Sequence, residues 1–276
     1  MPTRAILSAP QPIRPNSSLR ASLAGLAAAL LVAQADPARS ESCRLALVLA
    51  IDVSGSVSIA DDQLQRGGLA AALLATPVVS AFLDGGPVAL YAFEWAGASS
   101  QTALLGGWVM IQSETDLLHV AGTIAPSRQS GLDARQRGDG TAVGSALLHA
   151  AAALDAGPDC AARTVDVSGD GVNSQGIAPS VVLEALYDGI TVNALVIHET
   201  IQDPMLDRSL GGATPLVTWF NDTVLHGPGA FAIVADGYGD YEQAMTAKLL
   251  RELSLPMVSQ VVPAAGNLGQ AEVRGM

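Results

Sequence analysis

The sequence predicts an α/β domain with a doubly wound, mainly parallel sheet of six strands and helices on both faces. Apolar runs of strand length alternate with segments of helical periodicity, the order that parallel crossover connections require. The first run, Leu45–Ile51, is apolar throughout, as in a strand buried on both faces. A hydrophobic content of 49% in 276 residues is enough for one sizeable core. We expect one domain over residues 41–253.

The predicted elements follow from local patterns taken in chain order. Asp61 and Asp62 lie where the first turn of the first helix is expected, and the helix dipole favours negative charge there. Ser113 is a typical N-cap residue in front of a later helical pattern. A polar loop is expected at residues 126–140. The elements after the first strand are helix Asp61–Ala75, strands Val88–Phe93 and Trp108–Ile111, helices Ser113–Gly122 and Thr141–Leu154, strand Arg163–Val167, helix Pro179–Asp188, strand Ile190–Ile197, short helix Asp203–Leu210, strand Ala230–Ala235 and helix Tyr238–Leu253.

Residues 1–35 have the anatomy of a secretory signal peptide. A positive, acid-free stretch with Arg4, Arg14 and Arg20 precedes the small, apolar run Ala21–Ala33, and an Ala-Gln-Ala motif ends at Ala35. The alternative is an uncleaved N-terminal anchor, although this run is short for a helix that spans a bilayer. We expect an exported protein, periplasmic or secreted, with no membrane span after cleavage. Residues 254–276 lack periodicity and are expected to form a loose tail.

The charge balance bears on the class of partner. The chain has 14 Lys+Arg against 26 Asp+Glu, a formal net charge of −12. A phosphate backbone would be repelled by such a surface, so nucleic acid is not an expected partner, whereas cations or basic protein surfaces are. Lys248 is the only lysine, which removes a P-loop lysine from consideration.

Oxygen-bearing side chains follow two of the predicted strands. Asp52, Ser54 and Ser56 come directly after the first strand at alternate positions, so they can converge on one point. Thr141 opens the alanine-rich helix, and Asp170 follows a later strand at the same sheet edge. Hard oxygen donors of this kind suit Mg²⁺ or Mn²⁺. The Asp-x-Ser-x-Ser pattern by itself is also ordinary turn chemistry.

The order of these five residues and of the elements that carry them resembles the metal-ion-dependent adhesion site of von Willebrand factor type A domains. The resemblance covers nearly the whole chain after the signal. It implies that Asp52, Ser54, Ser56 and Thr141 contact a divalent metal directly or through water, with Asp170 acting through water. It also implies that a carboxylate from a partner protein completes the metal shell.

Further segments are similar to an uncharacterised family of exported bacterial A-domain proteins. That family carries no settled activity, so the likeness concerns the fold and not the role. Ser174 departs from the family's pattern, in which a second Asn is expected after Asn173. The segments that carry the likeness are Leu64-Gln65-Arg66, Phe93–Gly97, Asp166–Gly171, Gly189–Asn193 and Gly227–Phe231.

Two cysteines, Cys43 and Cys160, remain after the expected cleavage. In an oxidising compartment an even count favours a disulfide, the alternative being two buried free thiols. In the sheet that the resemblance implies, the first strand and the Arg163–Val167 strand are parallel neighbours, and both cysteines lie at its amino-terminal edge. Neighbouring strands are about 4.8 Å apart, and disulfide Cα atoms are roughly 4.4–6.8 Å apart. We expect a Cys43–Cys160 disulfide with a structural role.

Three other residues at strand ends have open interpretations. Glu94 and Trp95 either line a partner surface or pack and solvate a turn, with nothing in the sequence to decide between them. His198 is interpreted as a surface loop residue, because zinc-ligand spacings such as H-x-x-x-H and C-x-x-C are absent from the sequence.

The sequence therefore favours a monomeric, exported, metal-dependent binding module that recognises an acidic group on a partner protein and is not an enzyme. One alternative is a hydrolase that uses Ser54, Ser56 or a metal-activated water. No histidine at a motif position and no G-x-S-x-G elbow supports it. The other alternative is an envelope scaffold subunit without a switch.

Overall fold

The computed structural model describes residues 43–127, 140–198 and 215–254. In this part of the chain a seven-stranded sheet has the order β3-β2-β1-β5-β6-β7, and β4 pairs with β2 outside this path. Along the spatial order β2-β1-β5-β6-β7, each strand is parallel to its neighbours. β3 and β4 are both antiparallel to β2. The predicted doubly wound, mainly parallel sheet is confirmed, and the predicted number of six strands is wrong.

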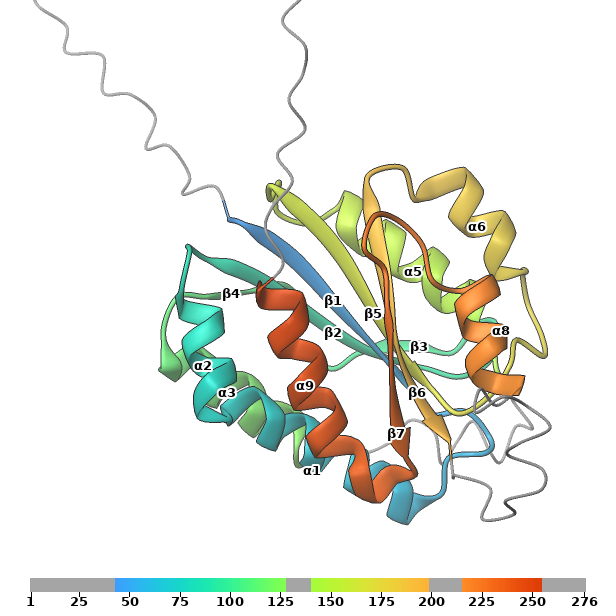
Figure 1. Cartoon of the computed structure of the whole chain (residues 1–276), viewed down its shortest axis with the longest axis horizontal. Coiled ribbons are helices and arrows are strands. Elements are labelled where there is room, and N and C mark those ends of the chain that lie inside the picture. Colours follow the sequence, from blue (N-terminus) through green and yellow to red (C-terminus); the bar gives the residue numbers. More distant parts are fainter. Residues whose placement is uncertain (1–42, 128–139, 199–214, 255–276) are drawn as a thin grey trace, which may run out of the picture. The chain divides into compact units, whose positions relative to one another are not determined.

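The elements follow the predicted order closely (Figure 1). The strands are β1 (Leu45–Asp52), β2 (Val88–Trp95), β3 (Gln101–Ala103), β4 (Val109–Ile111), β5 (Ala162–Gly169), β6 (Ile190–His198) and β7 (Ala232–Asp236). The helices are α1 (Ile59–Leu74), α2 (Thr76–Leu83), α3 (Glu114–Ile124), α5 (Val143–Asp155), α6 (Pro179–Leu186), α8 (Pro215–Thr223), the 3-10 turn η1 (Tyr238–Asp240) and α9 (Tyr241–Ser254).

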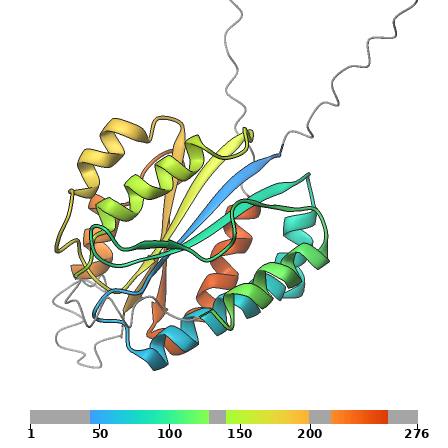
Figure 2. The same cartoon turned by 180° about the vertical axis from the view of Figure 1, so that it is seen from behind.

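The sheet separates two apolar cores, as the continuous apolar character of β1 requires. Every residue of β1 is buried, and successive side chains belong to different cores because a strand alternates its side chains between two faces. One core lies between the sheet and α5, α6 and α8, and the other between the sheet and α1, α2, α3 and α9. Figures 1 and 2 show these two helical layers from opposite sides.

Helix starts match the local capping signals. Ser113 caps α3 as predicted, and Ser58 caps α1; in each case the side chain of the third helical residue bonds back to the cap. The first helix was expected to end at Ala75; it ends one residue earlier, at Leu74, and Ala75 is its C-cap with extended backbone. A second helix, α2, follows directly and was not predicted. Pro77 lies in its first turn, where a missing N–H costs nothing.

Four other features differ from the sequence expectations. β3 has no apolar alternation and exists because it pairs with the end of β2. The expected Tyr238–Leu253 helix begins with a 3-10 turn, and α8 was not predicted. The Thr141–Leu154 helix starts at Val143, so Thr141 lies on the loop before it.

Several expectations lie outside the described residues: the signal peptide at 1–35, most of the polar loop at 126–140, the Asp203–Leu210 helix, and the tail after Ser254. Among the described residues, no single helix is long and apolar enough to cross a membrane. α1 and α2 together, bent by 60° where they meet, have the length and the apolar composition of a membrane-crossing segment, and only these two properties suggest it.

The topology brings two strand ends together at one place. β1 lies between β2 and β5, and the strand order reverses there, so the carboxyl ends of β1 and β5 are neighbours. Ligands of doubly wound sheets bind at such a reversal. The predicted Asp-x-Ser-x-Ser loop and Asp170 follow these two strands.

Candidate metal site

The loop after β1 is held in place at both ends. The Oδ1 of Asp52 accepts a hydrogen bond from the backbone amide of Ser54 at 2.7 Å. The backbone amide of Val57 donates to the carbonyl of Ser54 at 3.1 Å, closing a turn. Gln65 on α1 donates through Nε2 to the carbonyl of Asp52 at 2.9 Å. The loop that carries the two serines is therefore tied to both the strand and the following helix.

A chain of hydrogen bonds joins side chains from three loops. The hydroxyls of Ser54 and Ser56 are 3.2 Å apart, and Thr141 donates to Ser54 Oγ at 3.3 Å. Ser56 donates to Asp170 Oδ1 at 2.6 Å. Four of the five predicted site residues thus lie in one hydrogen-bonded group, although the loops are far apart in sequence.

Asp52, the fifth residue, is fully buried, and one of its two carboxylate oxygens accepts no hydrogen bond from the described residues. Its Oδ2 has no hydrogen-bond partner within the described parts of the chain. Burial and the negative charge of Asp170 together raise the pKa of Asp52 to about 8, against hydrogen bonds from Ser54 and the Asp170 backbone, which lower it. An ionised carboxylate in this place is costly unless a cation compensates it.

The donor set and the space around it fit a small divalent cation. Two glycines flank Asp170: a Cβ on Gly169 would lie 3.0 Å from Asp52 Oδ2, and one on Gly171 would lie 3.2 Å from Thr141 Oγ1. Side chains at these positions would fill space beside two of the oxygens. Two carboxylates and three hydroxyls form the hard, weakly charged oxygen set that Mg²⁺ and Mn²⁺ prefer.

The loop after β5 is hydrogen-bonded to the segment in front of α5. The backbone amide of Thr141 donates to Ser174 Oγ at 2.9 Å, and the amide of Ser174 donates to the Thr141 carbonyl at 2.8 Å. Asn173 accepts through Oδ1 from the amide of Gly144 at 3.1 Å, in the first turn of α5. Ser174, which departs from the expected Asn, therefore positions Thr141. The sequence analysis did not identify this role.

The structure decides the open interpretations of Glu94 and Trp95. Glu94 is 1% exposed and pairs with the buried guanidinium of Arg66, while Trp95 is fully buried beside Asp52 in the strand register. Both residues pack inside the molecule, so the interpretation as a partner surface is wrong. His198 is half-buried at the end of β6, which differs from the expected surface loop position.

Tyr238 belongs to the site and was missed by the sequence analysis. Tyr238 is the first residue of η1, at the start of the last helical segment. Its hydroxyl donates a hydrogen bond to Asp170 Oδ2 at 3.0 Å. Burial raises the pKa of this tyrosine, and the neighbouring charge of Asp170 raises it further, so the hydroxyl keeps its proton. No local motif marks Tyr238, because it reaches Asp170 across 68 residues.

The disulfide between Cys43 and Cys160 is present as expected. The two Cα atoms are 4.7 Å apart, and the residues precede β1 and β5. They lie at the amino-terminal edge of the sheet, opposite the Asp52 loop, because both strands run from the cysteines toward the site. The position indicates a structural role.

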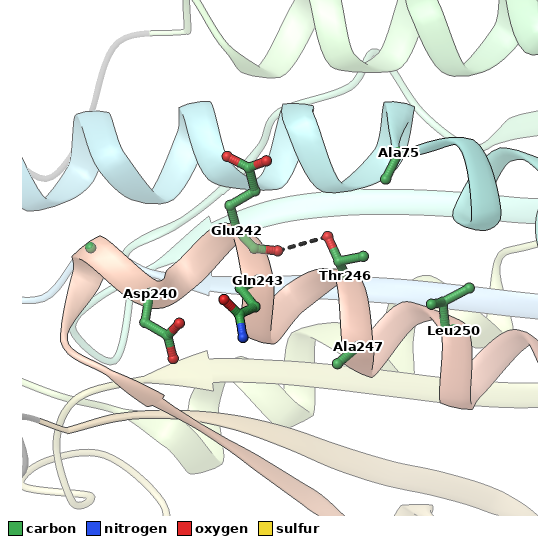
Figure 3. Close-up of a pocket in the computed structure, with 8 residues that line it drawn as sticks. Ala75, Asp240, Glu242, Gln243, Thr246, Ala247 and Leu250 are labelled. Atoms are coloured by element: carbon green, nitrogen blue, oxygen red, sulfur yellow. Dashed lines mark hydrogen bonds between the residues drawn. The ribbon is translucent and has the colours of Figure 1, made fainter.

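A separate groove of about 640 Å³ runs along α9 and contains none of the five predicted metal ligands. Figure 3 shows residues of α9 along it, with Ala75 at the end of α1. Its lining residues are Ala75, Gly239, Asp240, Glu242, Gln243, Thr246, Ala247 and Leu250.

Comparisons with known proteins give a family without an assigned activity. Residues 42–257 match a family model described as "Protein of unknown function (DUF1194)". No curated protein matches the chain.

Solved structures with a similar fold are distant in sequence. Proximal thread matrix protein 1 from the mussel byssus is 15% identical, with 77% of this chain and 48% of that chain covered and a TM-score of 0.48. A von Willebrand factor type A protein from Catenulispora acidiphila is 13% identical, with 77% and 43% covered and a TM-score of 0.46. BatB from Bacteroides thetaiotaomicron is 16% identical, with 76% and 98% covered and a TM-score of 0.42. The chain spans about half the length of the first two.

The family match covers most of the chain, from just before β1 to just beyond α9. The sheet order, the two helical layers and the loops at the β1 and β5 ends are those expected from the resemblance. The chain belongs to the DUF1194 family of proteins of unknown function, and its sheet and helical layers have the arrangement expected from the resemblance to von Willebrand factor type A domains.

Proposed function

We propose that this protein is an exported, metal-ion-dependent binding module that recognises an acidic group on a partner protein. Asp52, Ser54, Ser56 and Thr141 hold a divalent cation, Mg²⁺ or Mn²⁺, with Asp170 in the outer shell, acting through water. The bound cation supplies a positive centre to which a carboxylate of the partner binds.

One observation carries the metal assignment. Asp52 is buried, one of its oxygens has no hydrogen-bond partner in the described chain, and a hydrogen-bonded group of three hydroxyls and Asp170 lies beside it. A water-exposed turn would satisfy such an oxygen with solvent, whereas a buried carboxylate calls for a cation.

The exposure of the site supports binding more than catalysis. Ser56 is exposed, Thr141 and Asp170 are half-buried, and Asp52 and Ser54 are buried, so the group is open to solvent on one side. Two of the four histidines, which a serine nucleophile could use as a base, are engaged elsewhere: His149 lies by Tyr91 and His226 by the carbonyl of Tyr187. The hydrolase alternative therefore has less support than a binding role.

Export is supported by the disulfide, because disulfides persist in oxidising compartments. We propose a periplasmic or secreted, monomeric protein whose signal is removed after Ala35. The mass and N-terminal sequence of the protein recovered from cell fractions test the cleavage, and light scattering tests the monomer.

Calorimetry of the purified protein with Mg²⁺, Mn²⁺, Ca²⁺ and Zn²⁺ tests the metal site. Zn²⁺ is included because a structure of the mussel thread protein has zinc in its metal-ion-dependent adhesion site (MIDAS) motif. We expect Mg²⁺ or Mn²⁺ to bind wild type and the exposed-carboxylate control Asp155→Asn equally, and binding to disappear in Asp52→Ala. Metal at about 100 times its Kd should add about 2.7 kcal/mol to the free energy of unfolding of wild type and of Asp155→Asn, and should leave that of Asp52→Ala unchanged.

A folded wild type that binds none of these metals would refute the metal assignment. If the metal binds, a pull-down in Mg²⁺ against EDTA follows, and each captured partner is tested by replacing its surface Asp and Glu residues. A partner whose binding survives EDTA, or survives loss of all these carboxylates, would contradict the proposed mode of recognition.

A further inference from the structure

Both carboxylate oxygens of Asp170 are occupied by hydroxyl donors. Ser56 donates to Oδ1 at 2.6 Å, and Tyr238 donates to Oδ2 at 3.0 Å. Ser56 comes from the loop after β1, and Tyr238 from the segment between β7 and α9, so Asp170 is held from two sides. A carboxylate fixed in this way cannot turn to offer both oxygens to a cation without losing one of these bonds.

The backbone that carries Tyr238 is itself held firmly. Gly237 precedes it with a φ of 72°, a left-handed conformation that favours glycine, and its carbonyl accepts from the amide of Asp240 at 3.3 Å. Tyr241, one turn later, is fully buried, and its hydroxyl donates to Ser168 Oγ at 3.4 Å on β5. The start of the last helical segment is thus attached to the end of β5 by two tyrosines.

α1 packs closely against the same segment. A Cβ on Gly68 would lie 3.0 Å from the backbone nitrogen of Glu242 and 3.2 Å from the Tyr241 ring. This close approach leaves little room for the segment to move away from Asp170. The Tyr238 hydroxyl is therefore presented to Asp170 by rigid neighbours.

The chemistry of Mg²⁺ and Ca²⁺ makes this arrangement consequential. Ca²⁺ takes six to eight oxygens in flexible geometry, often including both oxygens of one carboxylate, whereas Mg²⁺ requires near-octahedral geometry, keeps several waters and binds few carboxylates. A carboxylate that stays in the outer shell and accepts a hydrogen bond from a ligating hydroxyl orients that hydroxyl toward the metal.

We propose that Tyr238 sets the metal selectivity of the site by fixing Asp170 as an outer-shell carboxylate, favouring Mg²⁺ over Ca²⁺. The inference rests on the proposed metal-binding function. Tyr238 acts through Asp170 and is a positioning residue. Without its hydroxyl, Asp170 Oδ2 becomes available to a cation that accepts more carboxylate oxygens, and the orientation of Ser56 is less well defined.

The test compares Tyr238→Phe with the matched variant Tyr241→Phe. The control loses a buried hydroxyl from the same segment without touching Asp170. Calorimetry with Mg²⁺ and with Ca²⁺ separately gives the ratio of the two affinities. We expect Mg²⁺ affinity of Tyr238→Phe to fall about tenfold, the lower range for lost outer-shell partners, with Ca²⁺ affinity unchanged or raised. The ratio in Tyr241→Phe should stay at the wild-type value.

Each outcome decides between the possibilities. An unchanged Mg²⁺/Ca²⁺ ratio in Tyr238→Phe, or an equal loss of both affinities, would overturn the inference and leave the proposed metal binding intact. Wild type without affinity for any metal would refute the proposed function itself, which is a different result. Thermal unfolding checks that each variant is folded. If Tyr238→Phe is not, Tyr238→Leu repeats the comparison with the same expected loss of selectivity.

Discussion

Asp166 on β5 and Lys248 and Glu252 on α9 form a buried group with one positive and two negative side chains, each no more than 1% exposed at the side chain. Lys248 Nζ lies 2.6 Å from Asp166 Oδ1 and 2.7 Å from Glu252 Oε1. Asn193 on β6 also donates to Glu252 Oε1 at 2.8 Å, and Tyr241 lies near Asp166. One lysine cannot balance two ionised carboxylates, so the group favours an additional proton.

That proton is held by Asp166. The pKa of Asp166 is raised from 3.8 to about 7, because burial and the charge of Glu252 raise it by more than Lys248 lowers it. A carboxyl whose pKa is higher in the folded than in the unfolded state binds more protons when folded. Its contribution to stability is therefore present at low pH and is lost as pH rises through the folded pKa. The loss amounts to roughly 1–2 kcal/mol at about pH 5 and about 4 kcal/mol at about pH 8.

Asp166→Asn removes this titration while its amide oxygen can still accept from Lys248. We expect the free energy of unfolding of the variant, relative to wild type, to increase by roughly 2–3 kcal/mol between about pH 5 and about pH 8. Urea unfolding at both pH values in metal-free buffer measures it. The control is Asp155→Asn, whose 75% exposed side chain pairs with Arg163 at 3.5 Å. It should show no such dependence.

A difference between Asp166→Asn and wild type that stays constant with pH would refute the reasoning. It would mean that Lys248 keeps Asp166 ionised throughout this range, and that the excess proton resides elsewhere. A decrease with pH would mean that Asp166 has a lowered pKa and stabilises the fold as an ion.

Three further outcomes are expected. Cys43→Ala with Cys160→Ala should lose about 4–5 kcal/mol of unfolding free energy by urea titration, from the entropy of an open loop, with metal binding unchanged because the cysteines lie at the opposite sheet edge; a loss of metal binding would contradict this. Arg66→Met takes a guanidinium from two buried carboxylates and should cost about 3–5 kcal/mol by the same assay. Gly144→Ala brings a methyl group against the backbone carbonyl of Ile177 and should lower both thermal stability and metal affinity; calorimetry showing unchanged affinity would show that the loop adapts.

The fold class was predictable because its signals are local. A strand buried on both faces must be apolar at every position, and β1 is. Capping serines satisfy helix amides within a few residues, so Ser113 marks the start of α3 in the sequence itself. By contrast, β3 has no pattern of its own and forms because β2 offers an unpaired edge. The strand number was miscounted for that reason.

The candidate site divides in the same way. Asp52, Ser54 and Ser56 lie on one turn, and Thr141 and Asp170 stand at element ends, so pattern and resemblance identified the group that the structure brings together. Their metal binding stays a proposal.

The sequence by itself determined the order of the main strands and helices, because apolar periodicity and caps are properties of short segments. The cysteine pair and the five oxygen-bearing residues were expected from their spacing together with the resemblance to von Willebrand factor type A domains. Only the tertiary structure decided that Glu94 turns inward to Arg66, that the sole lysine is buried with two carboxylates, and that Tyr238 holds Asp170. These contacts join residues distant along the chain. Their free energies come from burial and charge pairing that exist only after the layers have packed.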